Sequence, residues 1–335
     1  KENSIFTAVT IFAQLFSYFV ISLLIPPTST TFSGIKHRMS TTTTATLTPA
    51  DAEKMQASTE RGFLLGSQGV HNLASGGIEY GNKRPTFKDR FGERRHTLEH
   101  MACAFRVFGR RGYGEGSAGH ISVRDPVDPH TFWINPLGRH FSQMRVSDLV
   151  HVDSEANILP DGNQAAINAA GFKIHSELHK ARPDVNAACH AHTVYGKAWS
   201  AFGKELEMLN QDACMFYKKH SVYSDFGGVV LEADEGKRLA EALSDNKAII
   251  LQNHGLLTVG QTIDEAAYLF TLMERTCEVQ LQVEMASRHG LEKKIIGDEE
   301  AYYTYFNTSD PETLYTEFQP DYQLELELSN SAFLE

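Results

Sequence analysis

Apolar residues recur at intervals of three and four in five stretches of the chain, the pattern of a helix that buries one face. In the first stretch, Leu98, Met101 and Phe105 fall on one side of such a helix. The last stretch begins with Thr262, and Glu265 follows three residues later, which is the arrangement of a capping box. The pattern predicts helices over residues 90–111, 165–181, 193–202, 233–243 and 262 to about 289.

Short apolar or alternating runs bounded by Gly, Pro, Asn or Asp predict strands between these helices. A glycine-rich turn leads into an alternating run that ends at Arg124. Two apolar runs flank the Asn-His-Gly turn at 253–255, and this predicts two strands joined by that turn. We expect strands over 119–124, 132–135, 148–153, within 183–193, and over 229–231, 248–251 and 256–259.

The two ends of the chain differ in composition from its middle. Residues 5–26 hold an uncharged run of about 20 residues, long enough to span a bilayer. We expect 1–38 to be an apolar leader outside the mature protein, and a membrane anchor if it is retained. Residues 39–85 are expected to be a disordered, low-complexity lead-in with a short helix at 49–61. The main domain is then 86–295. An acidic arm, 296–335, lies over the body or a neighbouring subunit, with a disordered tail as the alternative.

Composition narrows the class of protein. The 335 residues are 41% hydrophobic and 22% charged, which fits a soluble protein of enzyme size with one large domain or two small ones. A formal net charge of −11 argues against a nucleic-acid partner, because no basic stripe is available to neutralise phosphates. The four cysteines are scattered without a C-x-x-C pair, which favours a reducing, cytoplasmic compartment over a disulfide scaffold.

Two histidines in the 183–193 stretch are candidate metal ligands. His190 and His192 are separated by one residue, and in a strand such residues point to the same face. A third imidazole, His254, sits at the predicted turn, where neighbouring strands of a sheet would bring it to the first two. The sequence thus predicts a three-histidine site with an open position. The alternative is three ordinary histidines, since the chain contains 15.

Six spaced motifs carry a family resemblance: Gly119–Arg124, Asn135–Gly138, Asp148–Asp153, His175 with Arg182–Val185, His190–His192 and Asn253–Gly255. Together they resemble the class II aldolase/adducin family over about residues 93–290. The resemblance implies an α/β fold, a three-layer α/β/α sandwich with a largely antiparallel central sheet. It also implies a homotetramer with active sites between subunits.

The resemblance further implies a divalent metal on His190, His192 and His254, to which family enzymes bind substrate oxygens. Zinc, Zn²⁺, is the default for three imidazoles with an open position. Fe²⁺, Mn²⁺, Co²⁺ and Ni²⁺ stay open, because geometry discriminates poorly among them.

This chain departs from the family aldolases at the positions that handle phosphate and protons. A Pro-Ser-Ser-Glu run of those enzymes matches Asn168–Gly171 here, so that Ala169 and Ala170 replace two phosphate-binding serines and Gly171 replaces the catalytic Glu. His120 replaces an Asn of the phosphate loop. These departures argue against a sugar-phosphate substrate and against the usual proton transfer.

Candidate substrate-binding positions follow from the family loops: Gly119, Ser122, Asn135, Gly138 and Gly171. Two residues are candidate catalytic groups. His120 could donate to an oxyanion or act as an acid, with a backbone-bonded loop imidazole as the alternative. Tyr217 could supply a proton to a carbanion, with packing as the alternative. We expect His175 to be a supporting group, His179 to lie on the helix surface, and the basic cluster at 218–220 to be solvated unless it meets an anionic substrate.

A three-histidine site without the family Glu favours chemistry that needs no base. In decarboxylation CO₂ leaves and a metal acts as the electron sink. We therefore expect a metal-dependent carbon–carbon lyase for a small, anionic, non-phosphorylated hydroxy, keto or aromatic acid. Two alternatives stay open: aldol chemistry with His120 or Tyr217 moving the proton, and a non-catalytic module like the adducin head, which assembles on the actin cytoskeleton. No nucleic-acid partner is expected.

Overall fold

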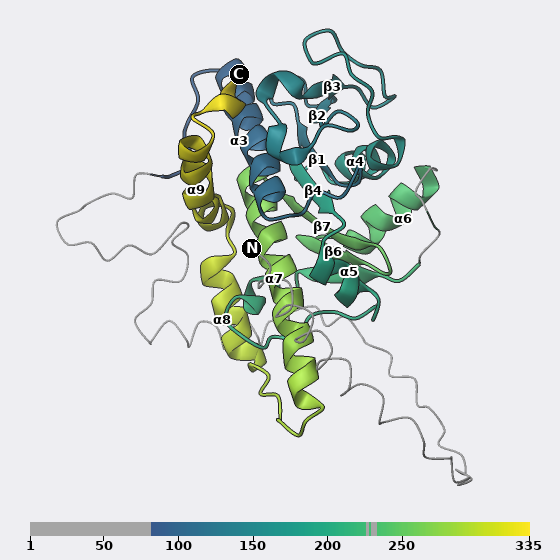
Figure 1. Cartoon of the computed structure of the whole chain (residues 1–335), viewed down its shortest axis with the longest axis vertical. Helices are drawn as coiled ribbons and strands as arrows, with labels where there is room; N and C mark the ends of the chain where they lie inside the picture. Colours follow the sequence, from purple (N-terminus) through teal and green to yellow (C-terminus); the bar gives the residue numbers. More distant parts are fainter. Residues whose placement is uncertain (1–81, 226–227, 229–232) are drawn as a thin grey trace, which may run out of the picture. The chain divides into compact units, whose positions relative to one another are not determined.

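The computed structural model describes residues 82–225, 228 and 233–335 (Figure 1). These residues belong to one compact unit, Pro49–Glu335. The expected leader, most of the lead-in, the helix at 49–61 and the strand at 229–231 lie outside the described residues. Within the described ranges, no helix is both long enough and apolar enough to cross a membrane.

A seven-stranded sheet with the order β3-β2-β1-β4-β7-β6-β5 forms the centre of the unit. All neighbouring strands are antiparallel except β5 and β6, which confirms the expected, largely antiparallel α/β sheet. The strands are β1 His120–Arg124, β2 Phe132–Ile134, β3 Val150–Val152, β4 Ala187–Ala191, β5 His220–Tyr223, β6 Ala248–Leu251 and β7 Gly255–Gly260.

Strand β5 falls where the sequence predicted a solvated basic cluster, and for His220 that prediction is wrong. The His220 ring is buried, donates from Nδ1 to the Phe216 carbonyl at 2.8 Å and accepts from the Leu206 N–H at 2.9 Å. Lys219 does reach the surface, where it pairs with Asp245 at 2.6 Å. The strand is only four residues long, which left too little alternation to predict it.

Helices cover both faces of the sheet (Figure 1). They are α3 Arg90–Arg110, α4 Ala169–Ala181, α5 Val194–Ser200, α6 Ala233–Leu243, α7 Ile263–Ser287, α8 Asp298–Thr308 and α9 Pro311–Leu328. The described residues also include short 3₁₀ turns at Phe141–Gln143, Val146–Asp148, Ala213–Phe216 and Ala332–Leu334. Helices α4 and α6 pack on one face, and α3 and α7 bury the larger core on the other.

Alternation along β4 decides which side chains reach which layer. Ala187, Cys189 and Ala191 belong to the core under α3 and α7, whereas Ala188 belongs to the core under α4 and α6. His190 therefore lies on the α4 face, since successive side chains of a strand point to opposite faces. The same alternation places His120 and Ser122 of β1 on the α4 face.

Two helix starts show how local chemistry sets the boundaries. Helix α4 begins at Ala169, four residues later than predicted, because the Asn168 side chain accepts from the Gly171 N–H at 3.1 Å and caps the helix there. Helix α7 begins where the capping box predicts, with the Thr262 hydroxyl accepting from the Glu265 N–H at 3.1 Å.

The last forty residues include α8 and α9, which pack against the rest of the unit. Leu314 and Phe318 of α9 join the main core beside α3 and α7. Arg111 of α3 pairs with Asp321 of α9 at 2.8 Å. Apolar residues on one side and charges on the other thus fix α9 to its own chain.

Candidate functional site

Three histidines from two chain segments converge at one end of β4. His190 is in β4, His192 follows the strand directly, and His254 lies in the turn between β6 and β7. Antiparallel pairing of Ala191 with Leu256 sets the end of β4 beside the start of β7, which brings the turn to the strand end. One ring nitrogen from each histidine lies within 4.8 Å of the other two.

The turn that carries His254 depends on its two neighbours. Asn253 has a φ of +57°, in the left-handed region that Asn tolerates better than most residues. A Cβ at Gly255 would stand 3.0 Å from the Ala191 carbonyl oxygen, so that β7 can approach β4 closely only with glycine there. The Asn-His-Gly sequence therefore holds His254 against the end of β4.

Hydrogen bonds leave nitrogens of these rings available for a ligand. His190 donates from Nδ1 to the Leu256 carbonyl at 2.8 Å, which places the lone pair on Nε2. Nε2 of His254 and Nε2 of His192 are 2.9 Å apart. Burial lowers the pKa of His190 well below its ordinary value and that of His254 to about 4, so both rings are neutral at pH 7. Neutral imidazole is the form that binds metals.

The geometry fits a divalent ion. Two nitrogens that each bind zinc at about 2.0–2.1 Å stand roughly 3.3 Å apart in a tetrahedral site. The 2.9 Å spacing of His192 and His254 is within a few tenths of an ångström of that value. The backbone bond at His190 Nδ1 is the kind of contact that orients metal-binding histidines in proteins.

Glu274 of α7 holds the segment that follows His192, and sequence reasoning missed it. Its buried carboxylate accepts hydrogen bonds from the Thr193 hydroxyl at 2.5 Å and from the N–H groups of Tyr195 and Gly196 at 2.9 and 2.7 Å. A carboxylate at the start of α5 is favoured by the helix dipole. Glu274 is followed directly by Arg275 in the sequence, so no local signal set it apart from an ordinary charged helix position.

His120 occupies the space that a side chain at position 171 would need. A Cβ built on Gly171 would meet Cδ2, Cγ and Nε2 of the His120 ring at 2.4 to 2.5 Å. His120 is also the cross-strand partner of His190, and the two rings stack with centroids 5.8 Å apart. The absence of a side chain at Gly171 thus makes room for the His120 ring, which lies beside the three histidines.

Burial lowers the pKa of His120 to about 4, with smaller contributions from His192 and His254. Its ring is therefore neutral at pH 7. Within the described part of the chain, neither of its buried nitrogens has a hydrogen-bond partner. Both nitrogens remain available to a ligand or to a neighbouring group.

The predicted loop residues separate into two groups. Gly119, with a φ of +92°, lies directly before His120, and a Cβ there would stand 2.9 Å from the Phe141 ring. Asn135 lies beside it, donating to the Gly119 carbonyl at 3.4 Å, and its own buried carbonyl has no partner among the described residues. Gly138 has a φ of +81° and stands in an exposed turn with open space around it.

Ser122 does not face a substrate space in this structure. Its hydroxyl bonds Nδ1 of His175 at 2.6 Å and Nε2 of His179 at 2.8 Å. Both histidines are buried, so the expectation that His179 lies on the helix surface is wrong. His179 occupies the same stripe of α4 as Gly171 and His175, and this stripe faces β1.

Tyr217 packs in a separate cluster with Met208, Cys214 and Ala301. Its ring contacts Tyr302 of α8, with centroids 6.4 Å apart. Burial raises the pKa of Tyr217. None of these contacts joins Tyr217 to the three histidines, and the packing role that the sequence left open is the one that the structure supports.

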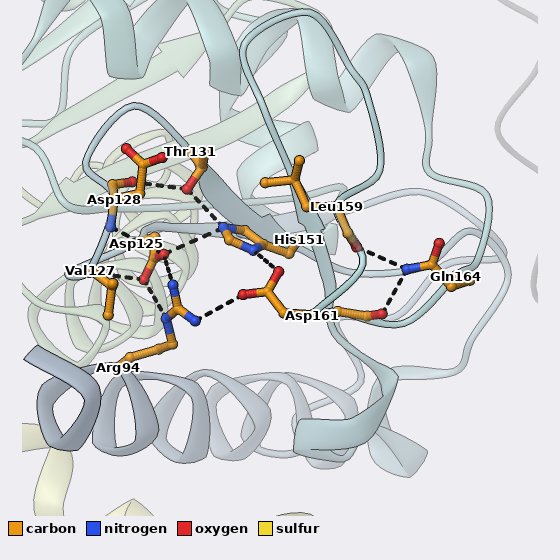
Figure 2. A network of polar contacts seen from close by, with 10 residues as sticks. Arg94, Asp125, Val127, Asp128, Thr131, His151, Leu159, Asp161 and Gln164 are labelled. Carbon is orange, nitrogen blue, oxygen red and sulfur yellow. Dashed lines mark hydrogen bonds and ion pairs between the residues drawn. The ribbon is translucent and has the colours of Figure 1, made fainter.

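Another buried histidine, His151, lies at the β2–β3 edge of the sheet, in the network of Figure 2. His151 donates from Nδ1 to Asp161 at 2.5 Å, and its Nε2 bonds the Thr131 hydroxyl at 2.7 Å. Arg94 forms a two-pronged ion pair with Asp125 and reaches Asp161 at 2.9 Å. Every ring nitrogen of His151 is thus engaged, which leaves no lone pair for a metal.

Comparisons with known proteins identify the family. The model of the Class II Aldolase and Adducin N-terminal domain matches residues 99–281. The Meiotically up-regulated gene 14 protein of Schizosaccharomyces pombe is 50% identical over 246 residues, which cover 73% of this chain and 95% of that protein.

Two bacterial relatives carry functional names. Decarboxylase NovR of Streptomyces niveus is 46% identical over 63% of this chain and 78% of its own length. The 4-hydroxy-3-prenylphenylpyruvate oxygenase/4-hydroxy-3-prenylbenzoate synthase of Streptomyces roseochromogenus is 47% identical over 63% of this chain and 76% of its own length.

A solved structure has the same fold. The L-fuculose 1-phosphate aldolase from Glaciozyma antarctica superposes with a TM-score of 0.69 at 39% identity, covering 75% of this chain and 97% of that one. The family match spans more than half of the chain and includes all three convergent histidines. The protein therefore belongs to the class II aldolase and adducin family.

Proposed function

We propose that this protein is a metal-dependent carbon–carbon lyase that decarboxylates a small, non-phosphorylated hydroxylated aromatic or keto acid. The observation that carries the proposal is the imidazole of His120 in the space beside Gly171, next to three histidines that form a candidate metal site. The group of candidate ligands found among the described residues contains no carboxylate.

An all-imidazole site suits an anionic substrate. Neutral histidines leave the charge of a divalent ion uncompensated, and a neutral ring in place of a carboxylate removes a repulsive charge from the path of an acid. A divalent ion bound there would supply the positive charge that stabilises the electrons left when CO₂ departs. His120, whose nitrogens have no partner among the described residues, could then take up a proton on its lone-pair nitrogen and pass it to the reacting carbon.

The relatives support an aromatic acid. One is named a decarboxylase, and another is named for a phenylpyruvate and a benzoate. Ala169 and Ala170 stand at the family positions whose serines hold a substrate phosphate, which argues against a sugar phosphate. Aldol cleavage is the second candidate, because the superposed structure is titled an aldolase.

The finer features are also proposals. We propose zinc as the metal, a homotetramer as the assembly and the cytoplasm as the location. Zinc has no redox chemistry, so an activity that consumes oxygen, as the name of one relative implies, requires iron or another redox metal instead.

The experiment is a turnover assay on purified protein loaded separately with Zn²⁺, Mn²⁺ and Fe²⁺. The panel contains hydroxylated phenylpyruvic and benzoic acids, β-keto acids, and short hydroxy-keto acids for the aldol reaction. CO₂ release is measured with and without oxygen, and His254→Ala serves as the metal-site control. We expect CO₂ from at least one aromatic or keto acid, abolished in the control. Absence of CO₂ from every acid with every metal contradicts the proposal.

A non-catalytic assembly role is the remaining alternative, since the matched family includes the adducin head. Metal content separates the two. Near-stoichiometric metal in protein purified without added ions favours the enzyme. Protein that takes up no metal and turns over nothing favours the assembly module.

A further inference from the structure

Strand β1 and helix α4 share a row of polar side chains behind the candidate site. His120 and Ser122 point from β1 toward α4, and Gly171, His175 and His179 line the facing stripe of α4 at intervals of four residues. Apart from Gly171, these residues carry polar side chains, although they lie between two apolar cores. In each of their hydrogen bonds, the donor and the acceptor can be assigned.

The assignment starts at His179 and follows from which of its ring nitrogens carries a hydrogen. Nδ1 of His179 lies 3.3 Å from the Val185 carbonyl, which can only accept, so Nδ1 carries the hydrogen. Burial lowers the pKa of His179 to about 3, so the ring is neutral and its Nε2 bears a lone pair. The Ser122 hydroxyl therefore donates to that Nε2 at 2.8 Å.

The hydroxyl has only one hydrogen, so its oxygen must accept at the other contact. Nδ1 of His175 is 2.6 Å away and hence carries the hydrogen. The His175 ring is fully buried and its pKa is lowered well below the ordinary value, which makes it neutral. Nε2 of His175 is therefore an acceptor, and within the described residues it is buried without a partner.

The unused acceptor lies next to His120. The two rings meet edge to face with centroids 5.9 Å apart. His192 and His254, whose nitrogens stand 2.9 Å apart, have centroids 4.7 Å apart. A movement of His120 by about one ångström, or a single bridging water, would thus connect the rings. Both nitrogens of His120 are buried without partners among the described residues, and its Nε2 is the one beside Gly171 on α4.

We propose that His175 is a positioning residue that fixes the tautomer of His120. The chain Val185–His179–Ser122–His175 ends in a lone pair. After the small movement of His120, or through one bridging water, that lone pair accepts the Nε2 hydrogen of His120 and leaves Nδ1 as the basic atom of that ring. The consequence for turnover rests on the proposed function. The hydrogen-bond pattern itself does not depend on the proposed function, and it can be measured in the metal-free protein.

Two isosteric variants separate positioning from structural support. Asn at position 175 keeps an N–H where Nδ1 donates to Ser122, but removes the acceptor at the Nε2 position. Gln at the same position places an amide oxygen near the Nε2 position and restores an acceptor. If His175 only supports the structure, His175→Asn should be less harmful than His175→Gln. If His175 positions His120, His175→Gln should be the less harmful variant.

Nitrogen-15 NMR of the histidine rings in the metal-free protein reads the tautomers directly. We expect His175 and His179 in the Nδ1–H form and His120 in a single Nε2–H form. His175→Asn should give a mixture of tautomers at His120, and His175→Gln should restore one. His130→Ala, at an exposed histidine, is the control and should leave the His120 signals unchanged.

Kinetics with any substrate found give the second readout. We expect His175→Asn to lower kcat by about 10- to 100-fold with little change in KM, and His175→Gln to recover most of it. An unchanged His120 tautomer in His175→Asn overturns the proposal, even if the enzyme is active. A shifted tautomer in a protein that turns over nothing instead upholds the positioning and contradicts the proposed function.

Discussion

Two histidine clusters lie at different places on the same sheet and differ in their partners. His151 bonds a hydroxyl and a carboxylate, and its neighbours Arg94 and Asp125 pair with each other (Figure 2). His192 and His254 face one another nitrogen to nitrogen, with no carboxylate in their group of candidate ligands among the described residues. His190 is as deeply buried as His151, whereas His192 and His254 are half-buried, so burial does not decide the role of a histidine here. The difference is whether polar partners from the protein use every ring nitrogen.

The comparison teaches how to separate a supporting histidine from a ligand. In a folded protein a buried polar atom normally has a partner. Where the protein supplies that partner, as at His151, the histidine holds elements together: α3, β2 and β3 meet at this network. Where imidazoles meet only each other, a metal or substrate is the expected partner.

The first prediction concerns the supporting cluster. Asp125→Ala leaves the Arg94 guanidinium without its buried partner, which costs about 3–5 kcal/mol of unfolding free energy. Denaturant unfolding measures it. Asp161→Asn is the control, because Asp161 pairs with the same arginine but is 46% exposed, and the amide oxygen can still accept from His151, so the change should cost less than about 1 kcal/mol. Equal effects of the two variants would contradict the assignment. The metal affinity of folded Asp125→Ala should equal that of the wild type.

The second prediction concerns the three-histidine cluster, where we expect a large loss of metal affinity and only a small loss of stability. His254→Ala removes one of three candidate ligands and should weaken metal binding by at least about 100-fold, beyond the range for supporting groups. Its effect on the unfolding free energy of metal-free protein should stay within about 1 kcal/mol, because the ring is half-buried and has no carboxylate partner. Competition with a chromophoric chelator measures the affinity. A variant that binds metal as tightly as the wild type would remove His254 from the site.

The third prediction tests the contact between His120 and Gly171. In Gly171→Ala the new methyl group meets the His120 ring at about 2.4 Å, and the strain should cost about 1–3 kcal/mol. Gly92→Ala is the control in helix α3. Its nearest neighbour would be 3.6 Å away, so the change should be neutral or stabilising by up to about 1 kcal/mol.

A double variant sharpens this test. With His120→Ala in the background, Gly171→Ala should become nearly neutral, because the ring that it meets is gone. Thermal and denaturant unfolding of the four proteins give the coupling energy. If the two substitutions change the unfolding free energy additively, the His120 ring and a side chain at position 171 do not compete for the same space.

The fourth prediction concerns pH. The pKa of His179 falls from its ordinary 6.5 to about 3 in the folded protein, mainly through burial. Below pH 6.5 the His179 ring binds a proton in the unfolded chain, whereas in the folded chain it stays neutral down to about pH 3. Stability is therefore complete above pH 6.5 and falls by about 1.4 kcal/mol per pH unit for this group as the pH drops toward 3.

His179→Gln isolates this contribution, since its amide oxygen can still accept from Ser122 but does not titrate. Between pH 6 and pH 4, the stability of the metal-free variant should depend on pH with one proton fewer than the wild type. Identical slopes would mean that His179 does not titrate in this window.

Sequence patterns predicted the elements with strong periodicity and the residues whose spacing is local. The one-residue spacing of His190 and His192 and the Asn-His-Gly turn were enough to name all three candidate ligands, because strand geometry and turn chemistry act over a few residues. Helix α6 has the predicted bounds, Ala233–Leu243. Strand β5 was missed, because its one buried and three half-buried residues carry no clear alternation.

Contacts between distant segments could not be predicted in this way. The burial of His179 and the carboxylate of Glu274 behind His192 depend on how α4 packs on β1 and how α7 packs on α5. From the sequence, the family resemblance implied that Gly171 stands where the family aldolases have a Glu. Only the packed structure shows that His120 stands in the space thus freed.

X-ray absorption on protein loaded with one zinc ion per chain shows which side chains bind the metal. We expect a first shell with three imidazole nitrogens at about 2.0–2.1 Å, reduced to two in His254→Ala. A shell built on sulfur or carboxylate without imidazoles, or one that His254→Ala leaves unchanged, would contradict this expectation.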